Sequence, residues 1–471
     1  MAASKKPQDG GQAAEGAKNA YEYAFEPVPE SKRKTGISLF MVLAGYPIAV
    51  SNFVTGAAVG YRMPFAEATA AFLCADAFLI AVAIMMGLAA FATGYSTAFL
   101  SRMVFGKRGS AIFSALIVLS SVTWIGINGN TFGSMVTANF PAIAVPSVII
   151  GVVIILVWSI SAAHGYKGME IVSWMGVPTA VAMGVICFVM VGMQSGGYGS
   201  LLSFAPPAGM EMGFTDATAS IVGSWLFGCL IAADVCRFAK SKRHVVVCCA
   251  GAFLLGLFGF QMVGCVVAQI AQNPNFSEAT ALMGLGYLVL ACTLVCLCTT
   301  QDNNIYGAGL AMQNILSETK LGGKVTHTQM AVFITALSSV LALCNILDYL
   351  LPVITFLSVL LSPVPALIVS ERVFVKHPKM GIMSNPVALA CWIAGGIVGQ
   401  VCLSANFFVP PVVSFLFTMV LYTAASKVLD GKLLAGRGLV VGGASVREGA
   451  VAADAAAGAV ATEGDAAGRT D

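Results

Sequence analysis

A run of hydrogen-bonding side chains interrupts an apolar stretch near residue 300. Residues 296–304 read CLCTTQDNN and lie between the apolar segments ALMGLGYLVLACTLV and IYGAGLAM. A polar group without a partner in hydrocarbon is costly, so such a run needs internal partners or a ligand. Hydroxyl and carbonyl oxygens suit a hard cation, and amides can bond the edge of a heterocycle. Cys296, Thr299 and Thr300 are spaced i, i+3 and i+4, so they share one helix face.

Two tryptophans lie among glycines and small polar residues. Trp124 occurs in SVTWIGINGN, and Trp225 occurs in GSWLFG. Two such rings can stack on a flat heterocycle while nearby polar groups bond its edge. The alternative is that both rings simply pack inside the protein.

Membrane-spanning helices must position these residues. The chain has 471 residues, of which 58% are hydrophobic and 10% charged, whereas soluble proteins carry about 25% charged residues. Apolar stretches long enough to cross about 30 Å of hydrocarbon recur along the chain. We expect twelve transmembrane helices, at residues 36–61, 66–92, 111–136, 143–162, 171–193, 216–238, 243–271, 280–312, 328–346, 349–371, 385–404 and 408–426. The eighth could end near Asn303 or continue to Asn314.

Lysines and arginines alternate between the two sides of these helices. One side carries clusters such as Lys32–Lys34, Arg237–Arg243 and Arg372–Lys379, whereas the loops of the other side carry only Arg62. The positive-inside rule then places both termini in the cytoplasm of a multi-pass protein of the cell (inner or plasma) membrane. We expect a cytoplasmic tail at 1–34, a membrane domain at 35–427 and a disordered cytoplasmic tail at 428–471.

Two of the expected helices, five apart in order, contain residues that weaken a helix. The first contains GYPIAVSNFVTG, with Pro47 in mid-membrane, and the sixth has Gly223 and Gly228 around Trp225. Matching breaks in two halves are typical of secondary transporters built from inverted repeats. We expect broken helices 1 and 6 in repeats of about 36–193 and 216–371, followed by two extra helices at 385–426.

Enzyme signatures are missing from the sequence. It contains no HExxH, GxSxG or Walker motif, so we expect neither an enzyme nor an ATP-driven pump. We expect no cofactor apart from a co-transported Na⁺ or H⁺, no nucleic-acid partner, and contact with the lipid bilayer. The oligomeric state stays open, and a monomer is compatible with the sequence.

Several blocks together resemble the cytosine permease branch of the nucleobase:cation symporter-1 family. They are EPVPESKRKTG, GKRGS, TWIGINGN, GSWLFGCLIAADVCRFAKSKRH and CTTQDNNIYGAGLAMQNI, and the match covers roughly residues 26–425. The resemblance implies an all-α membrane protein with the five-plus-five inverted-repeat (LeuT-like) fold and two extra helices. It also implies import of cytosine, a purine or a related ring compound with Na⁺ or H⁺.

The resemblance further implies a sodium site between helices 1 and 8. Its ligands would be the backbone carbonyls of Gly45, Ile48 and Cys296 and the hydroxyls of Thr299 and Thr300. The alternative is that both hydroxyls bond back to their own helix. The presence of two hydroxyls favours Na⁺ over H⁺.

The base pocket follows from the resemblance less completely. Trp124 and Trp225 would stack on the base, with Ser224 and the Gln301 amide at its edge. Two positions depart from the cytosine permease pattern, since Ser121 and Phe227 stand in place of a Gln and a Ser.

Asn128, one helical turn after Trp124, could supply the missing amide. The departures leave the cargo open, with allantoin, hydantoin and hydroxymethylpyrimidine as alternatives. A channel or a transport-derived sensor is the alternative of a different class.

Three of the carboxyl groups within the expected spans are candidates for a functional role. Asp302 could carry a proton or organise its polar neighbours, because an intramembrane carboxylate is a functional hypothesis by default. Asp234 lies three residues before Arg237, which favours a pair on the helix surface. For Asp76, packing or a hydrogen bond between helices is the favoured role.

Overall fold

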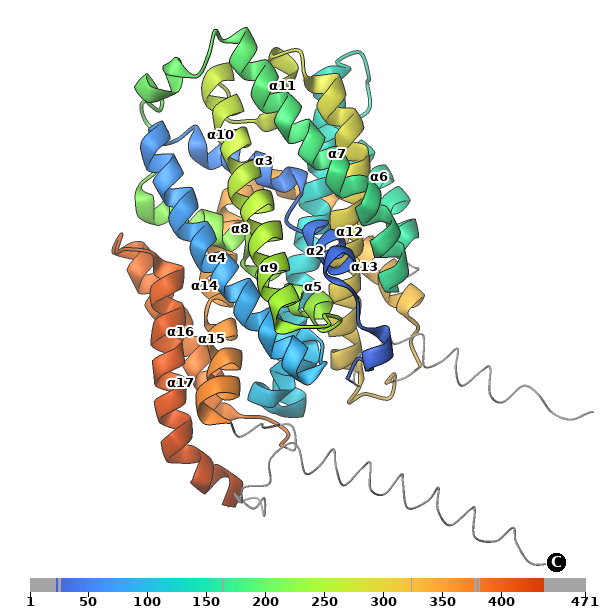
Figure 1. The fold of residues 1–471 in the computed structure, drawn as a ribbon, viewed down its shortest axis with the longest axis vertical. Helices are drawn as coiled ribbons and strands as arrows, with labels where there is room; N and C mark the ends of the chain where they lie inside the picture. The colour runs from blue at the N-terminus through green and yellow to red at the C-terminus, as the bar shows by residue number, and fades with distance from the viewer. Residues whose placement is uncertain are drawn as a thin grey trace, which may run out of the picture. The chain divides into compact units, whose positions relative to one another are not determined.

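The computed structural model describes residues 23, 27–162, 165–322, 324–376, 379 and 382–435. This part of the chain is helical apart from turns and one isolated bridge between Lys34 and Ala239. In chain order the elements are η1 (Glu30–Lys32), α2 (Gly36–Ala44), α3 (Val50–Gly60), α4 (Phe65–Thr93), α5 (Thr97–Asn139), α6 (Ser147–Ala162), α7 (Gly165–Gln194), η2 (Gly199–Ser203), α8 (Phe214–Cys236), α9 (Lys242–Phe253), η3 (Leu254–Gly259), α10 (Phe260–Ala271), α11 (Phe276–Leu282), α12 (Gly286–Leu316), α13 (His327–Leu343), η4 (Ile346–Tyr349), α14 (Leu350–Leu361), α15 (Pro363–Ser370), η5 (Glu371–Val375), α16 (Pro386–Ser404) and α17 (Pro410–Ala435) (Figure 1). The contacts divide the chain into two units, residues 1–423 and 424–471, and of the second only the end of α17 is described.

Eight helical stretches in the described part of the chain are long and apolar enough to cross a membrane. They are Phe65–Thr93, Thr97–Asn139, Glu170–Gln194, Phe214–Cys236, Lys242–Ala271, Ile346–Val375, Pro386–Ser404 and Pro410–Leu429, with shorter apolar helices at Val50–Gly60, Ser147–Ile160 and His327–Leu343. The protein is therefore an all-helical, multi-pass membrane protein. α12, which carries the polar run, is not among the eight, yet it is continuous and extends past Asn314 to Leu316.

The first expected helix is broken, as predicted. α2 ends at Ala44 and α3 begins at Val50, so residues 45–49 leave the helix. Pro47 lies in this break and has no N–H to donate. Asn52 caps the break from α3, since its Nδ2 donates to the Pro47 carbonyl at 2.6 Å. The break exposes backbone carbonyls in the middle of the helical bundle.

The sixth expected helix is not broken, so that prediction was wrong. α8 runs without interruption from Phe214 to Cys236. Its glycines serve close packing instead. A Cβ on Gly223 would lie 1.7 Å from the Ile354 carbonyl of α14, and one on Gly228 would lie 2.5 Å from the Trp225 ring. Small residues allow helices in a membrane to approach closely, so glycine here marks a contact and not a break.

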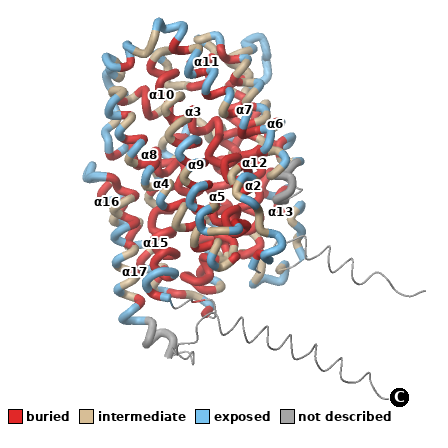
Figure 2. Tube along the Cα trace, viewed as in Figure 1, coloured by how far each residue is buried: buried red, intermediate tan, exposed pale blue. Residues whose placement is uncertain are grey.

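Buried residues concentrate on α5, α8 and α12, which pack with α4, α7 and α14 (Figure 2). α16 differs, because its buried residues recur every three or four positions and define a single face: Ala388, Cys391, Gly395, Gly399 and Cys402. The opposite face is apolar and exposed, for example at Ile393 and Ile397. One-sided burial of an apolar helix is what lipid contact requires.

The expected tails lie mostly outside the described residues, namely 1–22, 24–26 and 436–471. Part of each is described and ordered. Val28 is 2% exposed, and its N–H donates to the Gly94 carbonyl. α17 continues to Ala435, so residues 428–435 of the expected tail are helical.

Candidate functional site

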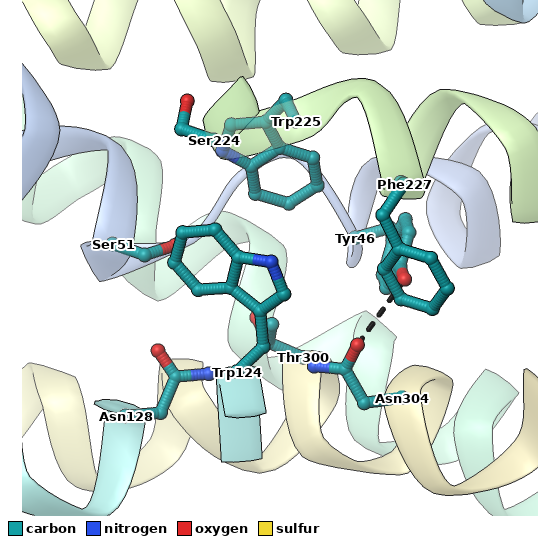
Figure 3. A pocket seen from close by; sticks show the side chains of 10 residues that line it. Tyr46, Ser51, Trp124, Asn128, Ser224, Trp225, Phe227, Thr300 and Asn304 are labelled. Carbon is teal, nitrogen blue, oxygen red and sulfur yellow. Dashed lines mark hydrogen bonds between the residues drawn. The ribbon is translucent and has the colours of Figure 1, made fainter. Parts of the chain in front are cut away.

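A small pocket lies where the α2–α3 break, α5, α8 and α12 meet (Figure 3). Its lining residues are Tyr46, Ser51, Trp124, Asn128, Ser224, Trp225, Phe227, Gly228, Thr300 and Asn304; we call it the tryptophan pocket. Its volume is about 10 Å³, which is room for about one water molecule. Side chains must therefore move before a ring compound can enter.

The two predicted tryptophans face this space from opposite sides. Trp124 points up from α5 and Trp225 points down from α8 (Figure 3), and they are 6% and 5% exposed. Trp225 is held edge-on to Tyr46, with ring centroids 5.4 Å apart and an interplanar angle of 87°. Gly228 leaves the room that the Trp225 ring occupies. The arrangement offers two apolar faces to a flat ligand.

Several polar atoms in and beside the pocket have no hydrogen-bond partner among the described residues. They are Ser121 Oγ, Asn128 Nδ2, Trp225 Nε1, Thr300 Oγ1 and Gln301 Oε1. A buried polar atom without a partner costs about 1–3 kcal/mol. Their concentration here indicates that a ligand or water completes the site.

The predicted base-binding residues are only partly brought together. Trp124, Asn128, Ser224 and Trp225 line the pocket, whereas Ser121 and Gln301 do not. Ser224 lines it with its hydroxyl already donating to the Ile221 carbonyl at 2.7 Å.

Gln301 is anchored from behind the pocket, since its Nε2 donates to the Ile125 carbonyl of α5 at 3.3 Å. Sequence reasoning did not assign Tyr46 and Asn304 to the pocket, although the Tyr46 hydroxyl donates to Asn304 Oδ1 at 3.2 Å across it (Figure 3). The signal for Tyr46 was its place beside Pro47 in the broken helix.

Oxygen atoms of the predicted cation site converge between the break and α12. Thr299 Oγ1 lies 2.9 Å from the Gly45 carbonyl oxygen and 2.7 Å from the Cys296 carbonyl oxygen. These are three of the five predicted ligands, and all are hard oxygens that fit an alkali cation. Ile48 lies in the same break, where its N–H donates to the Ala44 carbonyl. Thr300 instead lines the tryptophan pocket.

A third helix, α7, packs against the predicted cation site. A Cβ on Gly176 of α7 would lie 2.4 Å from Thr299 Cγ2, so only glycine lets α7 approach here. Ser173, one turn earlier, places its buried Oγ 2.6 Å from where a Cβ of Gly45 would stand. The Gly45 carbonyl therefore lies in a polar and tightly packed setting.

The predicted carboxylates have different surroundings. Asp234 Oδ1 accepts from the Thr97 N–H at 2.6 Å and so ties α8 to the first turn of α5, where a negative charge is favourable. Arg237 Nε donates to the Asp234 main-chain carbonyl at 3.1 Å, and its Nη2 donates to the Tyr306 hydroxyl. Asp302 is fully buried within α12. Neither Asp234 nor Asp302 lines the tryptophan pocket.

A larger cavity of about 740 Å³ lies at the start of α8. It is lined by Arg62, Asp216 and Gln400 among others. Ser220 and Thr355 line it too, and their hydroxyls are 3.2 Å apart. Ser220 precedes Ser224 by one helical turn, so α8 lines the two cavities about one turn apart.

Comparisons with known proteins agree on one family. Residues 27–422 match a family model described as "Permease for cytosine/purines, uracil, thiamine, allantoin". Cytosine permease of Escherichia coli (strain K12) is 24% identical over 374 residues, which is 78% of this chain and 85% of that protein.

Solved structures share the fold at low identity. One is Mhp1, a nucleobase-cation-symport-1 family transporter, solved in a closed conformation with bromovinylhydantoin bound. It superimposes with a TM-score of 0.73 and 16% identity, and the match covers 86% of this chain and 95% of Mhp1. Its inward-facing conformation gives a TM-score of 0.70, 17% identity, and coverage of 86% and 93%. A Na⁺-coupled sialic acid symporter in a substrate-bound outward-open state gives 0.61, 12%, and coverage of 88% and 93%.

Proposed function

The chain belongs to the family of permeases for cytosine and purines, uracil, thiamine and allantoin, and from that membership we propose that it imports a nucleobase by cation symport. It is a transporter and not an enzyme. The proposed cargo is cytosine or a purine, and the proposed coupling ion is Na⁺. We also propose twelve spans with both termini in the cytoplasm, arranged as two five-helix repeats plus two helices in the cell membrane.

The observation that carries the proposal is the pair of facing tryptophans with unpartnered polar atoms around them. A flat base between Trp124 and Trp225 would bury both of its faces. Its edge would then meet Asn128 Nδ2 and Thr300 Oγ1, which have no other described partner. A nucleobase combines these two properties, since it has two apolar faces and a rim of donors and acceptors.

Two relatives support a flat heterocycle as the cargo class. The Escherichia coli relative is named for cytosine, and Mhp1 was solved with a hydantoin bound. Phe227 lines the pocket where the cytosine permease pattern has a serine. The runner-up is therefore the same transport reaction with allantoin, a hydantoin or a hydroxymethylpyrimidine.

Cation coupling is supported by the oxygens around Thr299. A cation there would bind the carbonyl of Gly45 in the break and the carbonyl of Cys296 on α12, and so would join the two elements. Binding to one conformation stabilises that conformation. We propose that the bound cation holds the break in place while the tryptophan pocket is open. Binding of the base then closes the pocket, which is the step that alternating access requires. H⁺ is the alternative coupling ion.

A thermal-shift screen of the purified chain tests the function directly. Cytosine, purines, uracil, allantoin and hydantoin are each added with Na⁺ or with K⁺. We expect a Tm that rises with the concentration of one base, because a ligand that binds only the folded state stabilises it. The rise should be larger in Na⁺. A Tm that no heterocycle changes in either salt contradicts the proposed cargo class.

A further inference from the structure

A buried carboxylic acid lies outside the lining of the tryptophan pocket. Asp76, in the middle of α4, is 1% exposed. Neither of its carboxyl oxygens has a hydrogen-bond partner among the described residues. An ionised carboxylate in that position would lose its hydration without compensation, at a cost of several kcal/mol.

Among the described residues, the elements packed against α4 place no cationic side chain against Asp76. These elements are α3, α5, α8, α9, α10, α15, η2 and η3. Their titratable residues are Arg102, Lys107 and Arg108 of α5, Asp216, Cys229, Asp234 and Cys236 of α8, Lys242, Arg243, His244, Cys248 and Cys249 of α9, and Cys265 of α10. Of these, the Cys229 thiol lies near the Asp76 carboxyl.

The basic residues on these elements lie in the first third of α5 and at the start of α9. Cys249 Sγ donates to the Ala83 carbonyl, which lies two helical turns from Asp76 along α4. Lys242, at the start of α9, lies two helical turns from Cys249. Arg102 bonds Asn314 of α12.

The group that faces the Asp76 carboxyl is the amide of Gln261 on α10. Gln261 Nε2 lies 3.5 Å from Asn52 Oδ1, and Asn52 Nδ2 donates to the Pro47 carbonyl at 2.6 Å. Gln261 Oε1 is left without a partner among the described residues. A proton on Asp76 would donate to that oxygen and so satisfy both groups at once.

Protonation therefore completes a chain in which every hydrogen bond points the same way. It runs from the Asp76 O–H to Gln261, from Gln261 to Asn52, and from Asn52 to the Pro47 carbonyl in the α2–α3 break. An ionised Asp76 can only accept, so it would compete with Asn52 for the two N–H groups of the Gln261 amide. That competition weakens the Gln261–Asn52 bond and with it the hold of Asn52 on the break.

The surrounding helix is built to transmit such a change. The π-helix η3 ends at Gly259, two residues before Gln261, and π-helical turns are frequent at functional sites. A Cβ on Gly256 within η3 would lie 2.4 Å from the Pro47 carbonyl. The same segment therefore touches the break directly and also through Gln261 and Asn52.

We propose that Asp76 is a proton-binding site coupled to the α2–α3 break through Gln261 and Asn52. The ligand is a proton exchanged with water, held as the neutral carboxylic acid and released to leave the carboxylate. Proton binding by Asp76 stands by itself, whereas its coupling to import rests on the proposed function.

Infrared difference spectroscopy of the purified full chain tests the proton site without any cargo. We expect the carbonyl stretch of a protonated carboxyl that shifts in D₂O, fades at alkaline pH and is lost in Asp76→Asn. Asp76→Glu should restore a protonated band at a shifted frequency, and it serves if the Asn variant folds poorly. Asp348→Asn is the matched control, because Asp348 is an exposed carboxylate whose loss should leave the band unchanged.

Three results would overturn the proposal. The first is no protonated band attributable to Asp76 at any pH. The second is a band that vanishes on adding NaCl but not choline chloride, which assigns the carboxyl to a metal cation. The third is a band frequency that is unchanged in Gln261→Leu. That result would show that Asp76 does not bond Gln261, so no hydrogen-bond chain would connect Asp76 to the break.

Proteoliposomes test the coupling at constant Na⁺. An inward proton gradient should accelerate uptake of labelled cytosine by the wild type and not by Asp76→Asn, while both still respond to Na⁺. An equal response of the two proteins to the proton gradient contradicts the coupling. If no base is transported at all, the proposed function fails, and the infrared result still decides the proton site.

Discussion

Thr299 and Thr300 are neighbours in α12, yet their hydroxyls have opposite surroundings. Thr299 Oγ1 lies between the carbonyl oxygens of Gly45 and Cys296. Thr300 Oγ1 is equally buried and has no partner among the described residues. Successive residues on a helix point about 100° apart, so one faces the break and the other faces the tryptophan pocket.

The two hydroxyls therefore differ in whether their hydrogen bonds are already made before a ligand binds. The Thr299 hydroxyl lies within donating distance of both carbonyl oxygens, so a cation would replace a hydrogen-bond arrangement that already exists. Several polar atoms around Thr300 have no hydrogen-bond partner among the described residues. The free-energy cost of burying them is offset only when a ligand or water binds. Removing each hydroxyl should therefore have different consequences.

Trp124→Ala gives the largest expected effect, on the pocket side. Stacking of a base on an aromatic side chain contributes about 1–3 kcal/mol, so affinity for the base should fall about 5- to 150-fold. The measurement is the concentration dependence of the ligand-induced rise in Tm. Trp174→Ala is the matched control, because Trp174 is 48% exposed on α7. Unchanged affinity in Trp124→Ala removes the tryptophan pocket as the binding site.

Thr299→Ala should give the next largest effect, because it removes a hydroxyl that is already hydrogen-bonded. It leaves the Gly45 carbonyl without its hydroxyl partner, which should lower the free energy of unfolding by about 1–3 kcal/mol and lower the Tm of the ligand-free protein. The Na⁺ dependence of base binding should disappear. Thr179→Ala on the exposed side of α7, where the hydroxyl bonds only the Met175 carbonyl, should change neither. If Na⁺ dependence persists in Thr299→Ala, the cation binds elsewhere.

Thr300→Val should have the smallest effect on stability. It replaces an unpartnered hydroxyl with a methyl group of similar shape, so stability should change by less than about 1 kcal/mol or rise. Base affinity should nevertheless fall, because the hydroxyl is proposed to bond the cargo. A drop in Tm as large as that of Thr299→Ala would show that the two hydroxyls do not differ.

Residues next to one another in sequence were the most predictable parts of the site. The i, i+3, i+4 spacing placed Cys296 and Thr299 on one face, and both take part in the oxygen cluster. The break at Pro47 was predictable because a proline lacks the N–H that a helix needs. The break in α8 was predicted wrongly, because Gly223 fits equally well in a kink or against the Ile354 carbonyl of a neighbouring helix. Only the neighbour distinguishes these two uses.

The sequence by itself determined the membrane class, the family and the residue types of the site, since these depend on hydrophobic length, local spacing and motif. Tertiary structure alone decided which polar atoms are paired. It brought Gly45 to Thr299 and Asn52 to Gln261 across more than two hundred residues, and it left Asp76 and Thr300 without partners among the described residues. Hydrogen bonding in a bilayer depends on distances of a few ångströms between helices, which no local pattern encodes.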